Sequence, residues 1–156
     1  MPLNFDLAPK VYEVVSATPT PEQIAAYAEA SGDDNPRYRI GPEQIASPIF
    51  GVVPGFDALI MGPTNDPELG VGNPLMIVHG EQEFVYHRPL RPGEPLALLP
   101  TLERVEDKGS GATFVTKVAV STAGTPVLDL FATIFVRGGG SGTPRRRSLR
   151  LDSSCD

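Results

Sequence analysis

Four long runs of strand-forming residues in the second half of the chain restrict the possible folds more than any other feature. They are Met76–His87, Pro95–Glu106, Ala112–Ser121 and Val127–Arg137. In the last run apolar side chains recur at every second position, at Leu128, Leu130, Ala132, Ile134 and Val136. Asp129 and Thr133 lie between them, and this alternation is typical of a strand with one buried face. Turn-like connectors at Gly109–Gly111 and Ala123–Thr125 predict a meander of antiparallel strands.

A helix is predicted ahead of the strands, at about Pro21–Ser31. Thr20 is a suitable N-cap, Pro21 suits the first helical position, and Gln23 completes a capping box. Gly32 is expected to end the helix, because glycine readily adopts the left-handed conformation that follows a last helical turn.

Two further helical segments are predicted before the strands begin. The first is short and runs from about Pro42 to Ala46. The second, Pro48–Met61, is apolar on nearly all sides and should therefore be mostly buried. Pro54 and Gly55 within it predict a kink or a late start. Residues 62–74 are rich in glycine and proline and are expected to form a loop.

A long apolar helix followed by an antiparallel meander predicts an α+β fold of the hot-dog type. The sheet would curl around the mostly buried helix, and each would bury the apolar face of the other. We expect one domain over residues 1–137 and a flexible Gly/Arg-rich tail over residues 138–156, where almost no residue is apolar. Such an open sheet keeps edges, and pairing with a second copy would remove one.

Composition excludes several classes of protein. The formal net charge is -6, and five arginines lie in residues 137–150, so the predicted domain is more acidic than the whole chain. This charge argues against nucleic acid as a ligand. Apolar runs are interrupted within about ten residues, too short to cross a bilayer, and no secretory signal pattern is visible. The single cysteine, Cys155, permits no internal disulfide, and we expect a cytoplasmic protein.

The segment that carries the candidate chemistry is 27–38, which reads YAEASGDDNPRY. Two interpretations of its polar residues remain open. Asp33 either polarises a water molecule beside Asn35, or acts with its neighbours as a turn former after the helix. Asn35 in turn suits the cap of the next turn, whose direction Pro36 would fix.

Gly32, Asp33, Asn35 and Pro36 resemble the Gly-Asp-x-Asn-Pro-x-His signature of the MaoC-like, R-specific enoyl-CoA hydratases (hydratase 2). Tyr38 stands where that signature has its histidine. In the family, a carboxylate and a histidine hold one water and move its protons, and a backbone N–H at a helix N-terminus meets the thioester oxygen. A phenol titrates near pH 10 and is a poor general base at neutral pH. The resemblance therefore implies that half of the acid–base pair is missing.

Two more segments carry the same resemblance. Residues 79–93 and 106–111 are similar to the N-terminal half of two-domain hydratase 2 proteins. The resemblance implies a hot-dog fold and a thioester of CoA or of an acyl carrier as substrate, with no further cofactor. It is stronger to the N-terminal type of domain than to the catalytic C-terminal type.

Expected roles follow for individual residues. The candidate catalytic residues are Asp33, Asn35 and His79. The candidate substrate-binding residues are Tyr38, Arg88, Arg91, Phe50 and Phe56. His79 would replace the lost base if its strand passed near Asp33, and the alternative is a local hydrogen bond. His79 and His87 are eight residues apart in one predicted strand and are expected to share a face.

The remaining candidates also have two interpretations. Arg88 and Arg91 would meet CoA phosphates or an acidic neighbour, or stay exposed. The long apolar helix, with Phe50 and Phe56, would line an acyl-chain tunnel, or serve only as the core of the domain. Two histidines and a single tail cysteine do not predict a metal site.

Several functions are compatible with these expectations. In the first, the chain is a subunit or half-domain of an (R)-specific enoyl-CoA hydratase or 3-hydroxyacyl dehydratase, which binds the acyl chain and takes its catalytic histidine from a partner hot-dog domain. In the second, it is a self-sufficient homodimeric hydratase. In the third, it binds acyl-CoA without being an enzyme, and in the fourth it is a thioesterase. The expected partners are an acyl-CoA or acyl-ACP substrate and a second hot-dog subunit, in a homodimer or heterodimer, with neither nucleic acid nor membrane.

Overall fold

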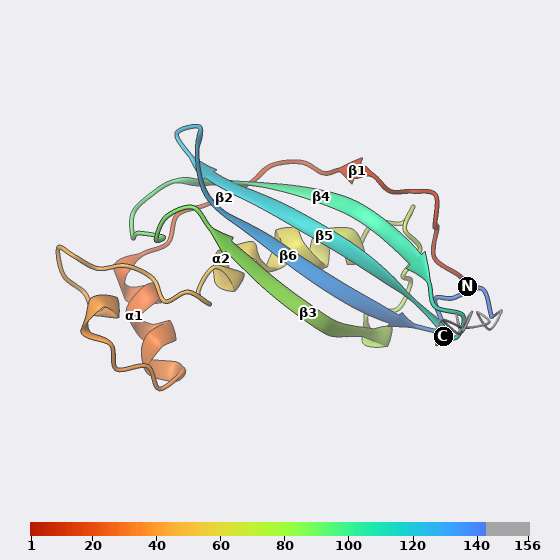
Figure 1. Ribbon diagram of the computed structural model, residues 1–156, viewed down its shortest axis with the longest axis horizontal. Helices are drawn as coiled ribbons and strands as arrows, with labels where there is room; N and C mark the ends of the chain where they lie inside the picture. Colours follow the sequence, from red (N-terminus) through yellow and green to blue (C-terminus); the bar gives the residue numbers. More distant parts are fainter. Residues whose placement is uncertain (143–156) are drawn as a thin grey trace, which may run out of the picture.

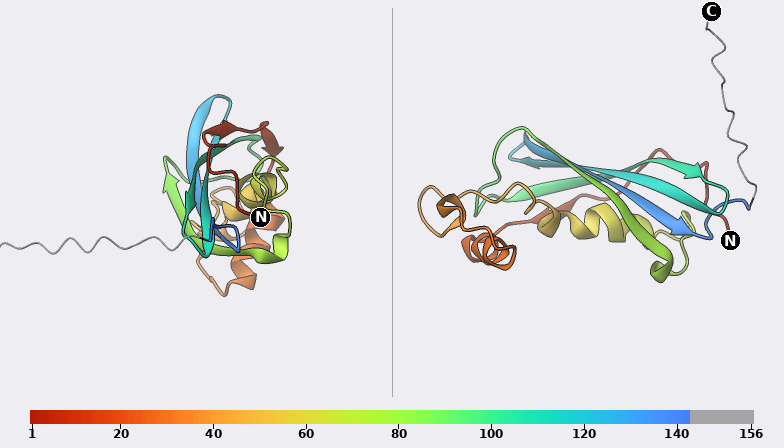
Figure 2. Two further views of the ribbon diagram at one scale, coloured as in Figure 1. Left: turned by 90° about the vertical axis from the view of Figure 1, so that its right-hand side faces the viewer. Right: turned by 60° about the horizontal axis from the view of Figure 1, so that its bottom comes forward.

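A curled antiparallel sheet lies over one central helix in the computed structural model of this chain (Figure 1). The structure describes residues 1–142, and the predicted flexible tail lies mostly outside them. The α+β hot-dog architecture expected from the sequence is confirmed. The first helix and the loop after it extend beyond one end of the sheet (Figures 1 and 2).

The four predicted strands all form, and each boundary lies within two residues of its prediction. Their ranges are β3 Ile77–Tyr86, β4 Leu96–Asp107, β5 Gly111–Thr122 and β6 Thr125–Arg137. Two short strands that the sequence did not predict, β1 Lys10–Val11 and β2 Val15–Ala17, both pair with β4. They are too short to show an alternating pattern, so their strand character comes from the partner they pair with.

The strand order is β1-β4-β5-β6-β3, with β2 also on β4, and every pairing is antiparallel. Only β4, β5 and β6 form the predicted meander. β3 pairs with β6, so the segment after it crosses the end of the sheet to reach β4. One edge of the sheet is therefore the long strand β3, while the other consists of the two short strands.

The central helix is continuous from Val52 to Thr64. Its parts are α2 Val52–Phe56, a π-helical turn η2 Asp57–Met61 and α3 Gly62–Thr64. The late start is confirmed, since Pro54 lies in the first turn, where a missing N–H costs nothing. The π turn immediately precedes Pro63, which has no N–H to donate, and the Gly62 N–H bonds five residues back to Asp57 O. No helix within residues 1–142 is long and apolar enough to span a bilayer.

The helix packs on the inner face of the sheet. The five alternating residues of β6 are all buried there, as predicted, while Asp129 and Thr133 lie on the partly exposed outer face. Gly55 allows the closest approach, because a Cβ at this position would lie 2.4 Å from Cδ1 of Leu130. The core of the domain thus lies between this helix and the three central strands.

The first helix, α1 Pro21–Ala30, begins with the predicted capping box. The Gln23 N–H donates to Thr20 Oγ1 at 3.1 Å, and the Thr20 N–H donates to Gln23 Oε1 at 2.9 Å. Gly32 adopts a φ of 69° just after the helix, which agrees with its expected role as a terminator.

The predicted helix at Pro42–Ala46 is wrong, because this segment forms a turn and then extends. The Gln44 side chain donates to the backbone oxygens of Pro21 and Tyr38, each at 3.0 Å. The Ala46 N–H bonds to Leu90 O at 2.8 Å. These tertiary hydrogen bonds outweigh the weak local helix preference and attach the loop to α1 and to the β3–β4 crossover.

Candidate functional site

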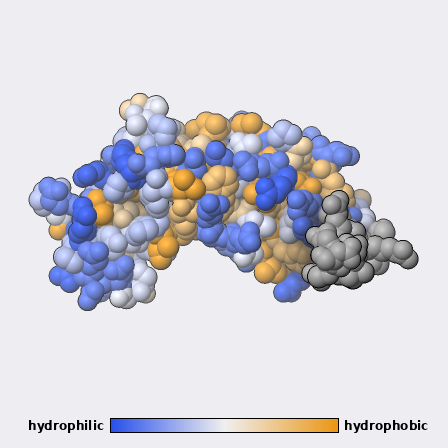
Figure 3. Space-filling view, in the orientation of Figure 1, coloured by the Kyte–Doolittle hydropathy of each residue, from blue (hydrophilic) through white to orange (hydrophobic). Residues whose placement is uncertain are grey.

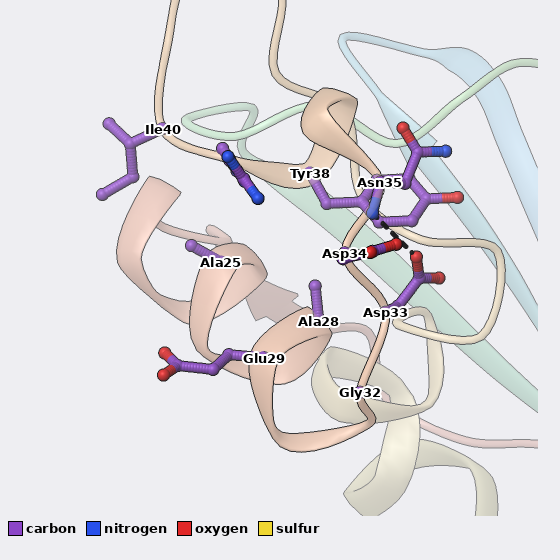
Figure 4. A pocket seen from close by; sticks show the side chains of 10 residues that line it. Ala25, Ala28, Glu29, Gly32, Asp33, Asp34, Asn35, Tyr38 and Ile40 are labelled. Atoms are coloured by element: carbon purple, nitrogen blue, oxygen red, sulfur yellow. Dashed lines mark hydrogen bonds between the residues drawn. The ribbon is translucent and has the colours of Figure 1, made fainter.

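The DDNP motif lies beside a cavity at the end of the sheet where β3 ends (Figures 1 and 4). The cavity has a volume of about 580 Å³ and separates α1 from the loop that follows it. Its walls are Ala25, Ala28 and Glu29 of α1 with Gly32, Asp33, Asp34, Asn35, Tyr38, Arg39 and Ile40 of the loop. The motif is therefore placed where its side chains can meet a ligand.

Asp33 and Asn35 shape the loop itself. The Asn35 N–H donates to Asp33 Oδ1 at 3.1 Å, shown as a dashed line in Figure 4. The Arg37 N–H donates to Asn35 Oδ1 at 3.0 Å, so Asn35 caps the short 3₁₀ turn η1 Pro36–Tyr38. The capping role expected for Asn35 is confirmed. The Asp33 and Asn35 side chains each accept one hydrogen bond within the turn. The catalytic role of Asp33 stays a prediction.

Tyr38 fills the histidine position of the signature and is 9% exposed. It separates the first cavity from a second one of about 290 Å³. The other walls of the second cavity are Ile45, Ala46, Pro48, Tyr86, His87, Arg88 and Pro89. A phenol therefore lies between the two cavities, at the position where the signature has an imidazole.

Tyr86, at the end of β3, was not singled out from the sequence, where nothing separates it from other strand aromatics. Its hydroxyl donates to Pro48 O at 2.6 Å and accepts a hydrogen bond from the Gly51 N–H. Burial raises the pKa of Tyr86 to about 12, while the bond from Gly51 acts in the opposite direction. Gly51 is the N-cap of α2, so a phenol already occupies the backbone donor at the start of the central helix.

The two histidines do not share a face, contrary to the prediction. A β-bulge between His79 and Glu81 shifts the register of β3 against β6 and changes the alternation. His79 lies opposite Ile134, and His87 is on the other face, with Nε2 3.2 Å from Asp129 Oδ2. His79 is seven residues before Tyr86, roughly 20 Å along a strand. The structure thus does not bring His79 to Asp33 within one chain.

The predicted arginines and phenylalanines are dispersed. Arg88 lines the second cavity, and its Nη1 is 3.0 Å from Glu94 Oε2, the acidic-neighbour alternative. Arg91 is exposed in the β3–β4 crossover. Phe50 is 1% exposed and packs edge to face on Tyr27, with the ring centroids 5.6 Å apart. Phe56 is 45% exposed, so the two phenylalanines do not line one cavity.

One cation of the first cavity was missed by the sequence analysis. Arg39 lines this cavity and Arg37 is exposed beside it, both in the same turn as Tyr38. Neither guanidinium forms an ion pair within residues 1–142. A basic residue directly after an Asn-Pro turn is a signal that could have indicated them.

Comparison with known families places these features in context. Residues 37–138 match the model of the MFE-2 hydratase 2 N-terminal domain. The chain belongs to this family. The match confirms the family expected from the resemblance; it covers strands β3 to β6 and begins at Arg37, directly after the Gly-Asp-x-Asn-Pro motif.

Relatives of this hydratase 2 N-terminal domain include bacterial UPF0336 proteins. One from Parafrankia sp. (strain EAN1pec) is 33% identical, over 78% of this chain and 85% of the relative. One from Saccharopolyspora erythraea is 29% identical, over 88% of this chain and 94% of the relative. The chain and these relatives are therefore similar over most of their lengths.

Solved structures support the hydratase 2 assignment of the fold. A MaoC-like dehydratase from Phytophthora capsici has a TM-score of 0.71 and 25% identity, covering 92% of this chain. The chain spans only 54% of the length of that protein. The HadBC (3R-hydroxyacyl-ACP dehydratase) complex from Mycobacterium tuberculosis has a TM-score of 0.65 and 20% identity, covering 85% of this chain and 99% of the matched chain.

Proposed function

We propose that this chain is the acyl-binding hot-dog subunit of an (R)-specific hydratase or dehydratase that acts on acyl thioesters and takes its catalytic histidine from a partner subunit. The observation that carries this proposal is the buried Tyr38 in the histidine position of the motif. Water addition needs a group that accepts and returns a proton near neutral pH. Asp33 has no imidazole beside it, because His79 is at the far end of β3 and His87 bonds to Asp129.

The start of the central helix supports the same proposal. A thioester oxygen that gains negative charge needs a free backbone donor. Here the Tyr86 hydroxyl accepts the hydrogen bond of the Gly51 N–H and lies against Pro48 O. A substrate carbonyl would have to displace a partly buried phenol from this place. Both requirements for the chemistry, the base and the oxyanion donor, are thus altered in this chain.

The surroundings of the site fit a thioester with an acyl chain. The second cavity is lined mainly by apolar atoms of Ile45, Ala46 and Pro48, which suits an acyl or pantetheine chain. Exposed arginines at positions 37, 39 and 91 lie at the same end of the sheet and could neutralise phosphate. Among the structural neighbours, HadBC acts on a (3R)-hydroxyacyl-ACP and another is the R-hydratase PhaJ1 from Pseudomonas aeruginosa.

The proposed partner has a surface to meet. Ile49, in the turn before the central helix, and Val53 and Phe56, in its first turns, are 49%, 44% and 45% exposed and lie four and three residues apart. The free edge of β3 is the margin of the sheet on which this helix packs. Two structural neighbours, HadBC and the ChsH1–ChsH2 complex, are assemblies of different chains. A second hot-dog subunit that continues the sheet would cover both surfaces.

Reconstitution tests the proposal. The purified chain is mixed with a hot-dog subunit that carries the complete motif with histidine, and hydration of crotonyl-CoA is followed by loss of the enoyl-thioester absorbance. We expect turnover by the mixture to exceed that of either subunit by roughly 10²–10⁴-fold, the usual contribution of acid–base catalysis. Binding without turnover in every mixture would contradict the proposal and favour a non-enzymatic carrier, and release of free thiol would favour a thioesterase.

Two variants at neighbouring positions distinguish the proposed two-subunit enzyme from a self-sufficient homodimer. Asp33→Asn keeps an oxygen that can accept from the Asn35 N–H, so the loop should hold while the charge is lost. Asp34→Asn is the matched control, because Asp34 lines the same cavity. We expect neither substitution to change the rate of the reconstituted mixture more than about threefold, because the partner supplies the acid–base pair. Turnover by the chain alone that Asp33→Asn abolishes would instead establish the homodimer.

A further inference from the structure

The free edge of the sheet carries a distinctive charge pattern. Within residues 1–142, β3 pairs only with β6, so one side of its backbone is unpaired over most of its ten residues. Glu81 and Glu83 lie opposite Thr133 and Phe131 of β6, and both glutamates are exposed on the outer face. Figure 3 shows this face, on which hydrophilic and hydrophobic residues are interspersed. A long edge of this kind is a ready template for another strand.

Within residues 1–142, no ion pair joins a cation to Glu81 or Glu83. Across β6, Lys117 stands over the Phe131 ring, with Nζ 5.6 Å from the centroid. Arg104 of β4 lines the same surface hollow as Glu81 and Glu83, and its Nε is 3.8 Å from Glu106 Oε1. Arg137 lies at the end of β6, and Asp129 adds another acidic group. Glu81 accepts one hydrogen bond, from Thr133 Oγ1 at 3.2 Å.

Symmetry restricts how two copies of β3 could pair. Directly opposite residues in an antiparallel pair point to the same face. A twofold axis that relates two identical antiparallel strands must therefore be centred on a residue position, so that this residue faces the same residue of the other copy. If it passes at Gln82, Glu81 of each copy faces Glu83 of the other. If it passes at Glu81 or at Glu83, that glutamate faces itself. Every register centred on the middle of β3 thus places like charges directly opposite each other.

We propose that the β3 edge selects against a second copy of this chain and fits a different hot-dog subunit, whose edge strand carries lysine or arginine opposite Glu81 and Glu83. This inference rests on the proposed function for the presence of a partner, and it adds the chemistry of the partner strand. A basic strand would form cross-strand ion pairs with Glu81 and Glu83 at the place where a copy of this chain forms one or two repulsive contacts, depending on the register. The charge pattern then determines which chains pair, while main-chain hydrogen bonds hold them together.

Sedimentation equilibrium of the purified chain tests the first part of the inference, that the β3 glutamates oppose pairing with a second copy. Glu81→Gln with Glu83→Gln keeps the acceptor oxygen for Thr133 and removes both charges. We expect the double variant to self-associate roughly 3–30-fold more tightly than the natural chain, since each like-charge pair opposes association modestly. Glu13→Gln is the control, because Glu13 is exposed between β1 and β2 at the opposite edge of the sheet and should leave self-association unchanged. An unchanged dissociation constant in the double variant would overturn the inference.

A charge-reversed copy tests the second part of the inference, that a basic edge strand pairs favourably with β3. In the variant Glu81→Lys with Glu83→Lys, each lysine would face a glutamate of the natural chain. A mixture of the two chains should associate more tightly than either chain alone, and 1 M salt should weaken this preference because the pairs are exposed. Equal association of all three samples would refute the inference. Neither measurement uses a substrate. Activity of the chain alone would therefore contradict the proposed function without testing the β3 edge. Unchanged association of the variants would overturn the inference on the β3 edge without testing the proposed function.

Discussion

Leu130→Ala is expected to lower the free energy of unfolding by about 3–4 kcal/mol, as large-to-small changes at fully buried leucines do. The Leu130 side chain is 0% exposed and lies between β6 and the central helix. Its Cδ1 would be 2.4 Å from a Cβ at Gly55, and its Cδ2 would be 3.4 Å from one at Gly51. The substitution therefore opens a cavity directly beneath the helix. Urea denaturation followed by circular dichroism measures the change.

Gly55→Ala tests whether the contact between Gly55 and Leu130 determines how closely the central helix approaches the sheet. In the natural chain its methyl group would overlap Leu130 and should cost about 1–3 kcal/mol. In the Leu130→Ala chain the space is available, so the double variant should be more stable than the sum of the two changes predicts, by at least about 1 kcal/mol. Gly62→Ala is the control on the same helix, where the new Cβ would meet only Asp57 O at 3.4 Å. Additive effects at Gly55 and Leu130 would contradict this account.

The long strands were predictable because each shows its own alternating pattern. In β6 the period of two repeats often enough to give both the strand and its buried face. β1 has two residues and β2 has three, and their strand character depends on pairing with β4, which no local pattern reveals. The position of β3 beside β6 was missed for the same reason, since connector length and turn residues favour neighbours in sequence.

The candidate site was predictable only where it depends on local rules. The Asn35 cap and the Gly32 terminator follow from side-chain size and hydrogen-bonding capacity, and both were expected. The relation between His79 and His87 was wrong, because a single extra residue at the bulge changes which face a side chain occupies. Tyr86 bonds to Pro48 and Gly51, which lie far earlier in the chain, and such distant contacts leave no sequence signature.

Asp66→Asn is expected to destabilise the protein by about 2–3 kcal/mol, because one carboxylate with charge-assisted bonds to several donors holds the N-terminal strand to the loop after the central helix. The Asp66 side chain is 6% exposed. Its Oδ2 accepts from Lys10 Nζ at 2.7 Å and from the Tyr12 hydroxyl at 2.9 Å, and its Oδ1 accepts from the Glu68 N–H at 2.9 Å. Glu68→Gln is the control: Glu68 also pairs with Lys10 but is 65% exposed, so its loss should cost at most about 0.5 kcal/mol.

The pH dependence of stability distinguishes the contribution of the Asp66 charge from that of the side chain's packing and hydrogen bonds. Burial alone would raise the pKa of Asp66, but hydrogen bonds from Lys10, the Glu68 N–H and Tyr12 together hold it below its ordinary value. The unfolded chain therefore takes up a proton at higher pH than the folded protein does. The stabilisation is complete above about pH 4–5 and is lost as pH falls through the folded pKa. The natural chain should exceed Asp66→Asn by a constant margin at neutral pH, and the margin should shrink in acid. If denaturant titrations down to about pH 3 give an unchanged margin, the substitution acts through lost packing or a lost hydrogen bond rather than through lost charge.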